Sequence, residues 1–224
     1  MNRAERLRKF DEVDIYPVTC EKLSAGRSNL EVLTAVIRGG AGIIQLREKD
    51  LNKRDFYRLA VKFRETTELA GLLLIINDHV DIALAVEADG VHLGQNDLPL
   101  QAARKIAPQM LIGASTHSLE EALRAQSEGA DYINIGPIFS TFTKAGVEHF
   151  LGPDAIGEIS SKVSIPFTVM GGIGEANIDR VVAAGARKIA VVSAITQADD
   201  IESQVRKFKE RIARAARSSR LSCE

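Results

Sequence analysis

The chain has 224 residues, of which 45% are hydrophobic and 26% charged, and its formal net charge is −1. This charge, three Tyr and no Trp argue against a nucleic-acid surface of basic patches and stacking aromatics, and no apolar run reaches the roughly 18 residues of a membrane span. Residues 1–12 lack the apolar core of a secretory signal, and Cys20 and Cys223 have no metal-type spacing. We expect a cytoplasmic protein that binds small molecules, without nucleic-acid or membrane partners; a homo-oligomer is an open alternative to a monomer.

Strand and helix patterns alternate along the chain. A charged helix over residues 3–11 is expected to cover the bottom of the fold, and a frayed tail is expected from residue 218. Apolar runs predict strands at residues 15–19, 42–47, 72–76, 90–93, 111–115, 131–136, 166–170 and 188–192. Amphipathic stretches predict helices at residues 29–38, 55–70, 80–86, 99–107, 118–128, 153–162, 177–184 and 200–217.

Glycine-containing segments recur just before several of these strands, at residues 39–42, 88–90, 129–131 and 185–187. Glycine permits the left-handed backbone that ends a helix. Continuous apolar strands between helices indicate a parallel sheet covered on both faces. Eight such units in 224 residues favour a single-domain (β/α)8 TIM barrel over residues 1–224. A doubly wound open sheet is the alternative.

Two aspartates follow neighbouring predicted strands. Asp78 stands after the strand at 72–76, and Asp97 follows the next one. Because consecutive parallel strands point the same way, both carboxylates should emerge on one face of the domain and repel unless a cation lies between them. Mg²⁺ suits such ligands and fills its other positions with waters and substrate phosphates. The alternative is structural, with Asp78 as a helix cap and Asp97 in an Asx turn before Pro99.

The second predicted strand ends in Gln45-Leu-Arg-Glu-Lys49. A period of two places Gln45, Arg47 and Lys49 on one side, toward the barrel mouth where active sites of such barrels lie. One amide and two cations suit an anionic substrate that forms hydrogen bonds. The alternative is a structural Arg47 paired with an acid on a neighbouring strand.

The loop after the sixth strand, residues 137–151, exceeds the usual length of about 2–6 residues in α/β units. With its hydroxyls and Lys144 it is interpreted as a phosphate-gripping lid; the alternative is a variable, solvated loop. Gly171-Gly-Ile-Gly174 and Val192-Ser-Ala194 end the last two strands. They predict a phosphate site, because glycines let backbone N–H groups approach an anion closely.

The histidines invite catalytic roles, but simpler ones are preferred. His92 lies within a short strand and is interpreted as a hydrogen-bonded packing residue, and His117 as a polar residue of a turn. Ser115 ends the fifth strand. No Ser-His-Asp order, Cys/His pairing or zinc spacing emerges, so no protein nucleophile is predicted.

With these residues in hand, the chain resembles the thiamine-phosphate synthase family over about residues 15–195. Seven motifs occur in the family's order, which is far more specific than any one of them. They are Gln45-Leu-Arg-Glu-Lys49, Ile76-Asn-Asp78, Gly90-Val-His-Leu-Gly-Gln-Asn-Asp97, Gly113-Ala-Ser-Thr-His117, Gly136-Pro-Ile-Phe-Ser-Thr-Phe-Thr-Lys144, Gly171-Gly-Ile173 and Val191-Val-Ser193.

The resemblance implies a transferase of thiamine biosynthesis, of the class that transfers alkyl groups other than methyl. A 4-amino-2-methyl-5-hydroxymethylpyrimidine diphosphate would lose pyrophosphate, and the ring nitrogen of 4-methyl-5-(2-hydroxyethyl)thiazole phosphate would take its place. Asp78 and Asp97 would hold Mg²⁺ on the pyrophosphate. The implied catalytic residues are Arg47, Lys49, Ser115 and Lys144. The implied substrate contacts are Gln45, Arg47, Lys49, Asn77, Ser115, Thr141, Thr143, Lys144, Gly172, Val192 and Ser193.

The chain departs from the family in its lid. Phe142 stands where Pro is usual, and Ala-Gly-Val-Glu-His-Phe follows Lys144 in place of an acidic segment. A related barrel, the thiazole tautomerase, shares the run His117-Ser-Leu-Glu-Glu121 but typically lacks the paired aspartates and the Thr-x-Thr-Lys segment. A non-catalytic phosphate-ligand sensor on the same scaffold would have lost the metal carboxylates, which this chain keeps.

Overall fold

The computed structural model describes residues 1–141 and 149–221, with side chains as far as residue 214. Parallel strands form one eight-stranded sheet in the order β1-β8-β7-β6-β5-β4-β3-β2. They are β1 (Ile15–Pro17), β2 (Ile43–Leu46), β3 (Leu73–Asn77), β4 (Gly90–Leu93), β5 (Leu111–Thr116), β6 (Tyr132–Ile135), β7 (Phe167–Val169) and β8 (Ile189–Val191).

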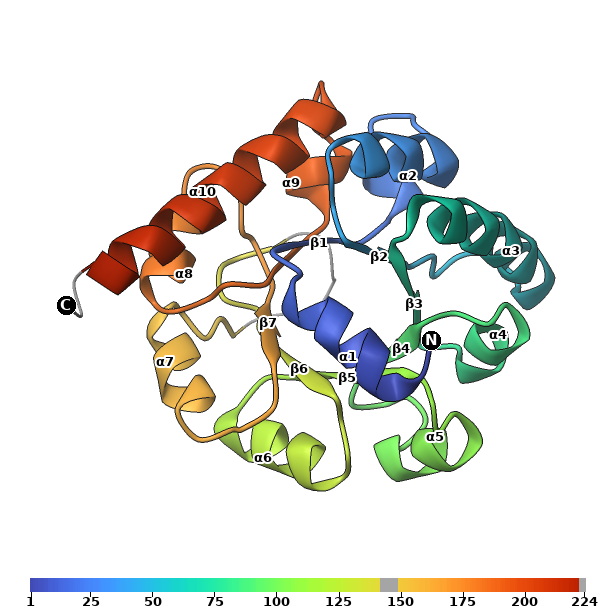
Figure 1. Ribbon diagram of the computed structural model, residues 1–224, viewed down its shortest axis with the longest axis horizontal. Helices are drawn as coiled ribbons and strands as arrows, with labels where there is room; N and C mark the ends of the chain where they lie inside the picture. Colours follow the sequence, from blue (N-terminus) through green and yellow to red (C-terminus); the bar gives the residue numbers. More distant parts are fainter. Residues whose placement is uncertain (142–148, 222–224) are drawn as a thin grey trace.

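The helices surround these strands, as the view along the barrel in Figure 1 shows. They are α1 (Arg3–Asp11), η1 (Glu21–Leu23), α2 (Asn29–Arg38), α3 (Lys53–Ala70), α4 (Val80–Ala85), α5 (Leu100–Ile106), α6 (Leu119–Ser127), α7 (Asp154–Ser160), α8 (Ile178–Ala183), α9 (Ser193–Thr196) and α10 (Ile201–Leu221). The helix η1 and the four-residue helix α9 were not predicted. The last helix, α10, continues to Leu221, where the sequence suggested a frayed tail from residue 218.

The barrel closes between its first and second strands at a short seam. Val18 and Gln45 form a single parallel bridge, and the Thr19 N–H donates to the Gln45 carbonyl at 3.0 Å. The Arg47 N–H donates to the Thr19 hydroxyl at 2.9 Å. The predicted (β/α)8 barrel is therefore confirmed, and the open-sheet alternative is wrong.

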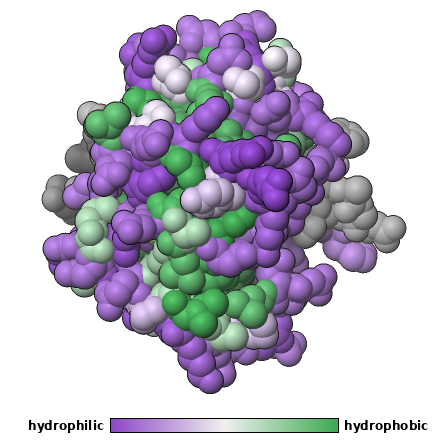
Figure 2. All heavy atoms as spheres, turned by 90° about the vertical axis from the view of Figure 1, so that its right-hand side faces the viewer, coloured by the Kyte–Doolittle hydropathy of each residue, from purple (hydrophilic) through white to green (hydrophobic). Residues whose placement is uncertain are grey.

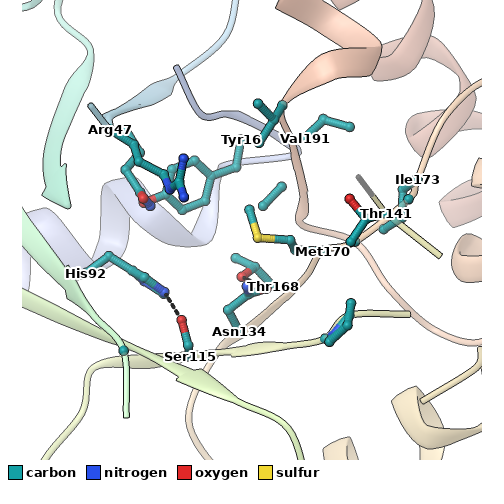
Figure 3. A pocket seen from close by; sticks show the side chains of 18 of the residues that line it. Tyr16, Arg47, His92, Ser115, Asn134, Thr141, Thr168, Met170, Ile173 and Val191 are labelled. Carbon is teal, nitrogen blue, oxygen red and sulfur yellow. Dashed lines mark hydrogen bonds between the residues drawn. The ribbon is translucent and has the colours of Figure 1, made fainter. Parts of the chain in front are cut away.

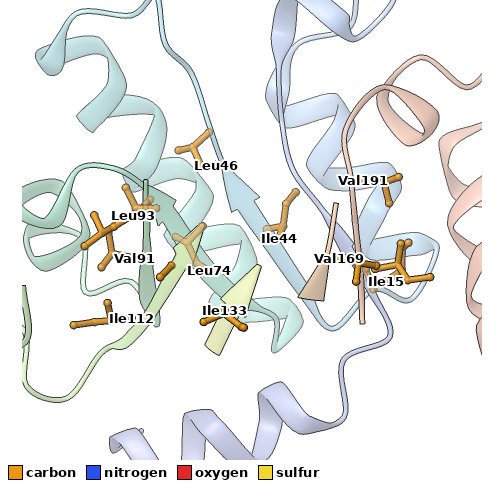
Figure 4. Packing of buried hydrophobic residues seen from close by; sticks show 14 of the residues in the cluster. Ile15, Ile44, Leu46, Leu74, Val91, Leu93, Ile112, Ile133, Val169 and Val191 are labelled. Carbon is orange, nitrogen blue, oxygen red and sulfur yellow. The ribbon is translucent and has the colours of Figure 1, made fainter. Parts of the chain in front are cut away.

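Successive strand side chains alternate between two apolar environments. Ile44 and Leu74 belong to the large core shared with helix residues such as Phe56, and Figure 4 shows this layer of strand residues. Ile43 and Leu73, each one residue earlier, belong to a separate cluster within the barrel. This alternation fixes which side chains of each strand can reach the barrel interior, and hence the site at its mouth.

Helix α1 lies across one end of the barrel (Figure 1), as expected from residues 3–11. Its Phe10 is fully buried and packs on the Tyr132 ring, with 4.4 Å between the ring centroids. The helix therefore seals the interior at the end opposite the carboxyl termini of the strands.

Two buried carboxylates anchor this helix. Asp89 and Asp131 stand directly before β4 and β6, and each accepts a hydrogen bond from a backbone N–H of the preceding strand. Loss of one partner of a buried ion pair leaves an uncompensated charge and is strongly destabilising. These carboxylates therefore have a structural role. Each is paired with one arginine of α1 and one of a barrel helix, namely Arg6 and Arg64 for Asp89, and Arg3 and Arg104 for Asp131.

The outer surface is mainly polar. Figure 2 shows the side that carries α3, α4 and α5, which is mostly hydrophilic with a hydrophobic area in its lower half. Exposed large apolar residues on α4, on α5 and between them include Leu84, Leu98 and Ile106. Within the described residues, no helix combines the length and the apolar character needed to cross a membrane.

Candidate active site

A cavity of about 870 Å³ opens at the carboxyl ends of the strands, and each strand or the segment following it contributes to its wall. Figure 3 shows Arg47, His92 and Ser115 on one side, and Met170, Ile173 and Val191 on the other. Thr141 lies among the apolar residues of the second group, so both sides carry polar groups. The predicted site residues that line it are Gln45, Arg47, Lys49, Asn77, Asp78, Asp97, Ser115, Thr141, Gly172, Val192 and Ser193. Two further predicted residues, Thr143 and Lys144, lie outside the described residues.

The end of β2 presents its polar side chains to this cavity as the period of two requires. Gln45, Arg47 and Lys49 all line the wall, while Leu46 packs in the outer core. Among the described residues, Arg47 forms no ion pair with a carboxylate. Its positive charge is therefore available to a ligand, and the alternative of a structural Arg47 ion pair receives no support.

The two aspartates lie close together with a lysine beside them. Asp78 follows β3 with φ of 62°, and its N–H donates to the His92 carbonyl at 2.9 Å. Its carboxylate forms an ion pair with the ammonium of Lys49. Burial raises the pKa of Asp97, and the neighbouring Asp78 carboxyl raises it further, although a hydrogen bond from the Gly94 N–H at 2.6 Å opposes the shift.

Of the two structural alternatives for these aspartates, the helix cap is wrong and a turn at Asp97 is present. The helix cap predicted for Asp78 is wrong, because His79 holds the cap position of α4 and no side chain caps that helix. Asp97 does stabilise a turn, since its carboxylate accepts the Gly94 N–H while its own N–H donates to the Gly94 carbonyl at 3.2 Å. Asp97 can therefore serve both the turn and a ligand, because a carboxylate has lone pairs for several partners.

The residues present fit a magnesium ion that takes some of its ligands from the protein and the others from substrate phosphates and water. No three His, Cys, Asp or Glu side chains gather into a metal site in the described part of the chain. The pair Asp78 and Asp97 alone matches the one or two carboxylates that Mg²⁺ takes when phosphates and waters complete its shell. Burial is the main cause of the raised pKa of Asp97, and the neighbouring Asp78 carboxyl adds to it; a bound cation would oppose both effects.

A chain of hydrogen bonds runs through the barrel interior to the polar wall. Gln45 Nε2 donates to the Tyr16 hydroxyl at 3.0 Å, and the Tyr16 and Tyr132 hydroxyls lie 3.0 Å apart. His92 contacts the Tyr132 hydroxyl through Nδ1 at 3.2 Å and the Ser115 hydroxyl through Nε2 at 3.0 Å (Figure 3). The prediction that His92 is a hydrogen-bonded packing residue is confirmed, and it also lines the cavity.

Burial keeps this chain uncharged. It raises the pKa of Tyr16 and of Tyr132 above the usual phenol range. It lowers the pKa of His92 to about 4, against a smaller opposing effect of the Asp78 carboxylate. Near neutral pH the phenols are therefore protonated and the imidazole is neutral.

Several wall residues were missed by the sequence analysis. Asn134 and Thr168 are buried in β6 and β7, and the Thr168 hydroxyl donates to Asn134 Oδ1 at 3.0 Å. Their signal was a polar residue between apolar neighbours in a strand, the pattern already used for Gln45. Tyr16 was missed in the same way, and His117, which binds the Gly136 carbonyl through Nδ1 at 2.5 Å, also lines the cavity.

The structure explains why glycine stands at position 172, which the sequence did not reveal. It was predicted to let a phosphate approach the backbone. Its φ is 61°, and an added Cβ would lie 2.1 Å from the Ser140 carbonyl oxygen. Glycine is therefore required at this position by the packing of the chain itself, whatever ligand binds.

A family model, two relatives and a solved structure point to one family. The family model described as thiamine monophosphate synthase matches residues 15–195. The chain is 47% identical to the thiamine-phosphate synthase of Chloroflexus aurantiacus, over 87% of this chain and 90% of that one. It is 45% identical to that of Pelotomaculum thermopropionicum, over 96% and 99%. A solved structure of the thiamine phosphate pyrophosphorylase from Pyrococcus furiosus superposes with a TM-score of 0.83 at 35% identity, covering 91% of this chain and 96% of that chain.

Proposed function

The chain belongs to the thiamine monophosphate synthase family and is a transferase of thiamine biosynthesis, and from this premise we propose its substrates and mechanism. It joins 4-amino-2-methyl-5-hydroxymethylpyrimidine diphosphate to 4-methyl-5-(2-hydroxyethyl)thiazole phosphate, giving thiamine phosphate and pyrophosphate. The observation that carries this proposal is the meeting of two cations, two carboxylates and a polar hydrogen-bonding wall in one cavity at the barrel mouth.

The proposed reaction breaks one C–O bond and forms one C–N bond, and the side chains of the cavity suit these two changes. The C–O bond between the methylene carbon and the diphosphate breaks, and both electrons leave with the diphosphate oxygen. The lone pair of the thiazole ring nitrogen then forms a C–N bond to the same carbon. No proton is transferred, so the reaction needs neither a protein nucleophile nor a general base. An aminopyrimidine stabilises the methylene cation, so departure precedes attack.

The main barrier is then the negative charge that collects on the departing diphosphate. Arg47 and Lys49 supply positive charge to it from the segment just after β2, where they line the cavity. Preorganised charges of this kind are commonly the largest catalytic contribution in such sites. Lys144, of the loop after β6, is proposed as a further cation.

The remaining predicted site residues orient the two substrates. Gln45 and Asn77 hold the pyrimidine diphosphate together with the cations, and Ser115 and Thr141 face the reactants. The thiazole phosphate binds toward the ends of β7 and β8 and the loop after β6. Its proposed contacts are Thr143, Gly172, Val192 and Ser193.

Asp78 and Asp97 are the residues that would hold magnesium. When bound, the ion would neutralise charge on the diphosphate and so assist its departure. Lys49 already offsets the charge of Asp78, and the turn at Gly94 holds the Asp97 carboxylate. These contacts support the proposal, because they keep both carboxylates at the mouth before any ligand arrives.

The proposal is tested by incubating the purified protein with both substrates and Mg²⁺ and following pyrophosphate and thiamine phosphate together. Equimolar formation of both products is expected, with no thiamine phosphate when either substrate is omitted. A thiazole tautomerase would isomerise its substrate without any pyrimidine diphosphate. A sensor would bind phosphorylated ligands without turnover. Either of these results would overturn the proposed reaction.

A further inference from the structure

Ser115 is held in place through both its backbone and its side chain. Gln95 Nε2 donates to the Ser115 carbonyl at 2.6 Å, and Arg124 Nη2 donates to Gln95 Oε1 at 2.9 Å. The Ser115 hydroxyl oxygen lies 3.0 Å from His92 Nε2. The position of the oxygen is therefore fixed, and its chemical role depends on where its hydrogen points.

The direction is set at the far end of the buried chain. Gln45 Nε2 donates to the Tyr16 hydroxyl, which has one hydrogen of its own. Of the groups that the structure describes, the other one within hydrogen-bond distance is the Tyr132 hydroxyl at 3.0 Å. Because Tyr16 is 1% exposed and a buried unpaired donor is costly, Tyr16 donates to Tyr132.

The direction then propagates to Ser115. Tyr132 accepts from Tyr16 and donates its own hydrogen to His92 Nδ1 at 3.2 Å. A ring nitrogen that accepts carries no hydrogen, so the neutral imidazole has its hydrogen on Nε2. That N–H donates to the Ser115 oxygen at 3.0 Å.

We propose that the buried chain Gln45–Tyr16–Tyr132–His92 fixes the Nε2–H tautomer of His92 and thereby makes Ser115 a hydrogen-bond donor to the substrate. The Ser115 oxygen is occupied by the His92 N–H, so its own hydrogen turns to the cavity. The inference rests on the proposed function and deepens it, because it makes the substrate atom beside Ser115 an acceptor. Tyr16, Tyr132 and His92 are positioning residues that act through Ser115.

The barrel has room for this chain because of one glycine. At Gly113, on β5, an added Cβ would lie 2.1 Å from Tyr132 Cζ and 2.6 Å from His92 Nδ1. Any larger residue there would separate the two groups. Phe10 of α1 packs on the Tyr132 ring, with 4.4 Å between centroids, and so restrains the phenol.

The tautomer can be measured without any substrate. In protein with ¹⁵N-labelled histidine at neutral pH, long-range ¹H–¹⁵N spectra distinguish a protonated ring nitrogen from an accepting one. The chain has four histidines, so the His92 signals are identified by their loss in His92→Gln. We expect Nε2 to be protonated and Nδ1 to be a hydrogen-bonded acceptor.

Two phenol substitutions complete the spectroscopic test. In Tyr132→Phe the His92 Nδ1 signal should move toward that of an unbonded nitrogen. The matched control is Tyr57→Phe, on the exposed face of α3, which should leave the signal unchanged. An Nδ1–H tautomer in the wild type, or no response to Tyr132→Phe, would overturn the proposal.

A pair of amide substitutions tests the link to catalysis. In His92→Gln the amide nitrogen can take the place of Nε2 and donate to Ser115, whereas the shorter side chain of His92→Asn reaches only the Nδ1 position. We expect kcat to fall by roughly 10²-fold in His92→Asn, as for a misplacement of about 1 Å, and clearly less in His92→Gln, with smaller changes in KM. Equal losses would overturn the proposal. If the wild type formed no thiamine phosphate, the proposed reaction would be refuted. The spectra would still show whether the hydrogen-bond chain fixes the His92 tautomer.

Discussion

Lys49 and Asp78 form an ion pair at the mouth of the barrel, between the segments that follow the neighbouring strands β2 and β3. Asp97 lies beside this pair, and Arg47 lines the same cavity. The two cations and two carboxylates nearly cancel, so these side chains alone offer little net attraction to a diphosphate. Additional positive charge, from a metal ion and from Lys144, is what the proposed reaction requires.

The first prediction concerns the aspartate pair. Asp78→Asn and Asp97→Asn should each raise the Mg²⁺ concentration for half-maximal activity, by at least the roughly 10–100-fold that an outer-shell substitution costs. Asn tolerates the positive φ of 62° at Asp78, so the melting temperature of that variant should stay near the wild-type value. Activity titrated against Mg²⁺, with melting temperature alongside, makes the measurement.

Two controls bracket that result. Asp81→Asn removes an exposed carboxylate paired with Lys53 on the neighbouring helix, and should change neither quantity. Asp131→Ala removes a buried carboxylate bound by Arg3 and Arg104 and should cost roughly 3–5 kcal/mol of unfolding free energy while leaving the Mg²⁺ response unchanged. If the two site variants behaved like Asp131→Ala, the metal-site interpretation would be abandoned.

The second prediction concerns the loop after β6. Lys144→Ala should lower kcat by roughly 10²–10³, the usual effect of removing one donor aimed at developing charge. Steady-state kinetics with both substrates at saturation measure it. Lys105→Ala, on exposed α5, is the matched control and should retain wild-type turnover. Near-normal turnover of Lys144→Ala would make Lys144 a solvated loop residue.

The third prediction separates crowding from backbone strain. Gly172→Ala should lower the free energy of unfolding by about 1–3 kcal/mol, because its Cβ meets the Ser140 carbonyl and its φ is positive. Gly129→Ala has a φ of 91° but nothing within 4 Å of the added Cβ, so it should cost less. Urea unfolding compares the two. A Gly172→Ala protein of wild-type stability with selectively weakened thiazole-phosphate binding would show that the added Cβ crowds the ligand and not the chain.

The fourth prediction follows from the buried imidazole. The pKa of His92 lies at about 4 in the folded protein, against 6.5 for the unfolded side chain, so the unfolded state binds more protons between these values. Stability should therefore fall as the pH falls from 6.5 toward 4, with a slope of up to about 1.4 kcal/mol per pH unit from this group. Urea unfolding of the wild type and of His92→Gln across this range isolates the effect. Parallel stability curves would contradict it.

Much of the fold was predictable because the strands are continuous apolar runs. The strand β4 and the helices α1 and α2 have the predicted bounds, and the other predicted elements agree within about two residues at most ends. The helices η1 and α9 were missed because segments of three and four residues are too short to repeat a hydrophobic pattern.

The site was predictable where chemistry and periodicity coincide. Gln45, Arg47 and Lys49 share one side of a strand, and that alone brings them to the cavity. Asn134 and Thr168 carry the same signal, but only closure of the barrel shows that their side of the strand is the interior one. The contact between Gly172 and Ser140 joins segments far apart in sequence, and no local pattern reports such a contact.

The seam between β1 and β2 links closure of the barrel to the integrity of the cavity. Gln45 and Arg47 bond Val18 and Thr19, just after β1, through their backbones and line the cavity through their side chains. A molecule that opened at this seam would keep its other strand pairings and lose one wall of its cavity. Closure of the barrel and formation of this wall of the cavity thus depend on the same two residues. A diphosphate bound to the β2 side of the cavity would stabilise the closed form, in which the two ends of the sheet, β1 and β2, are paired.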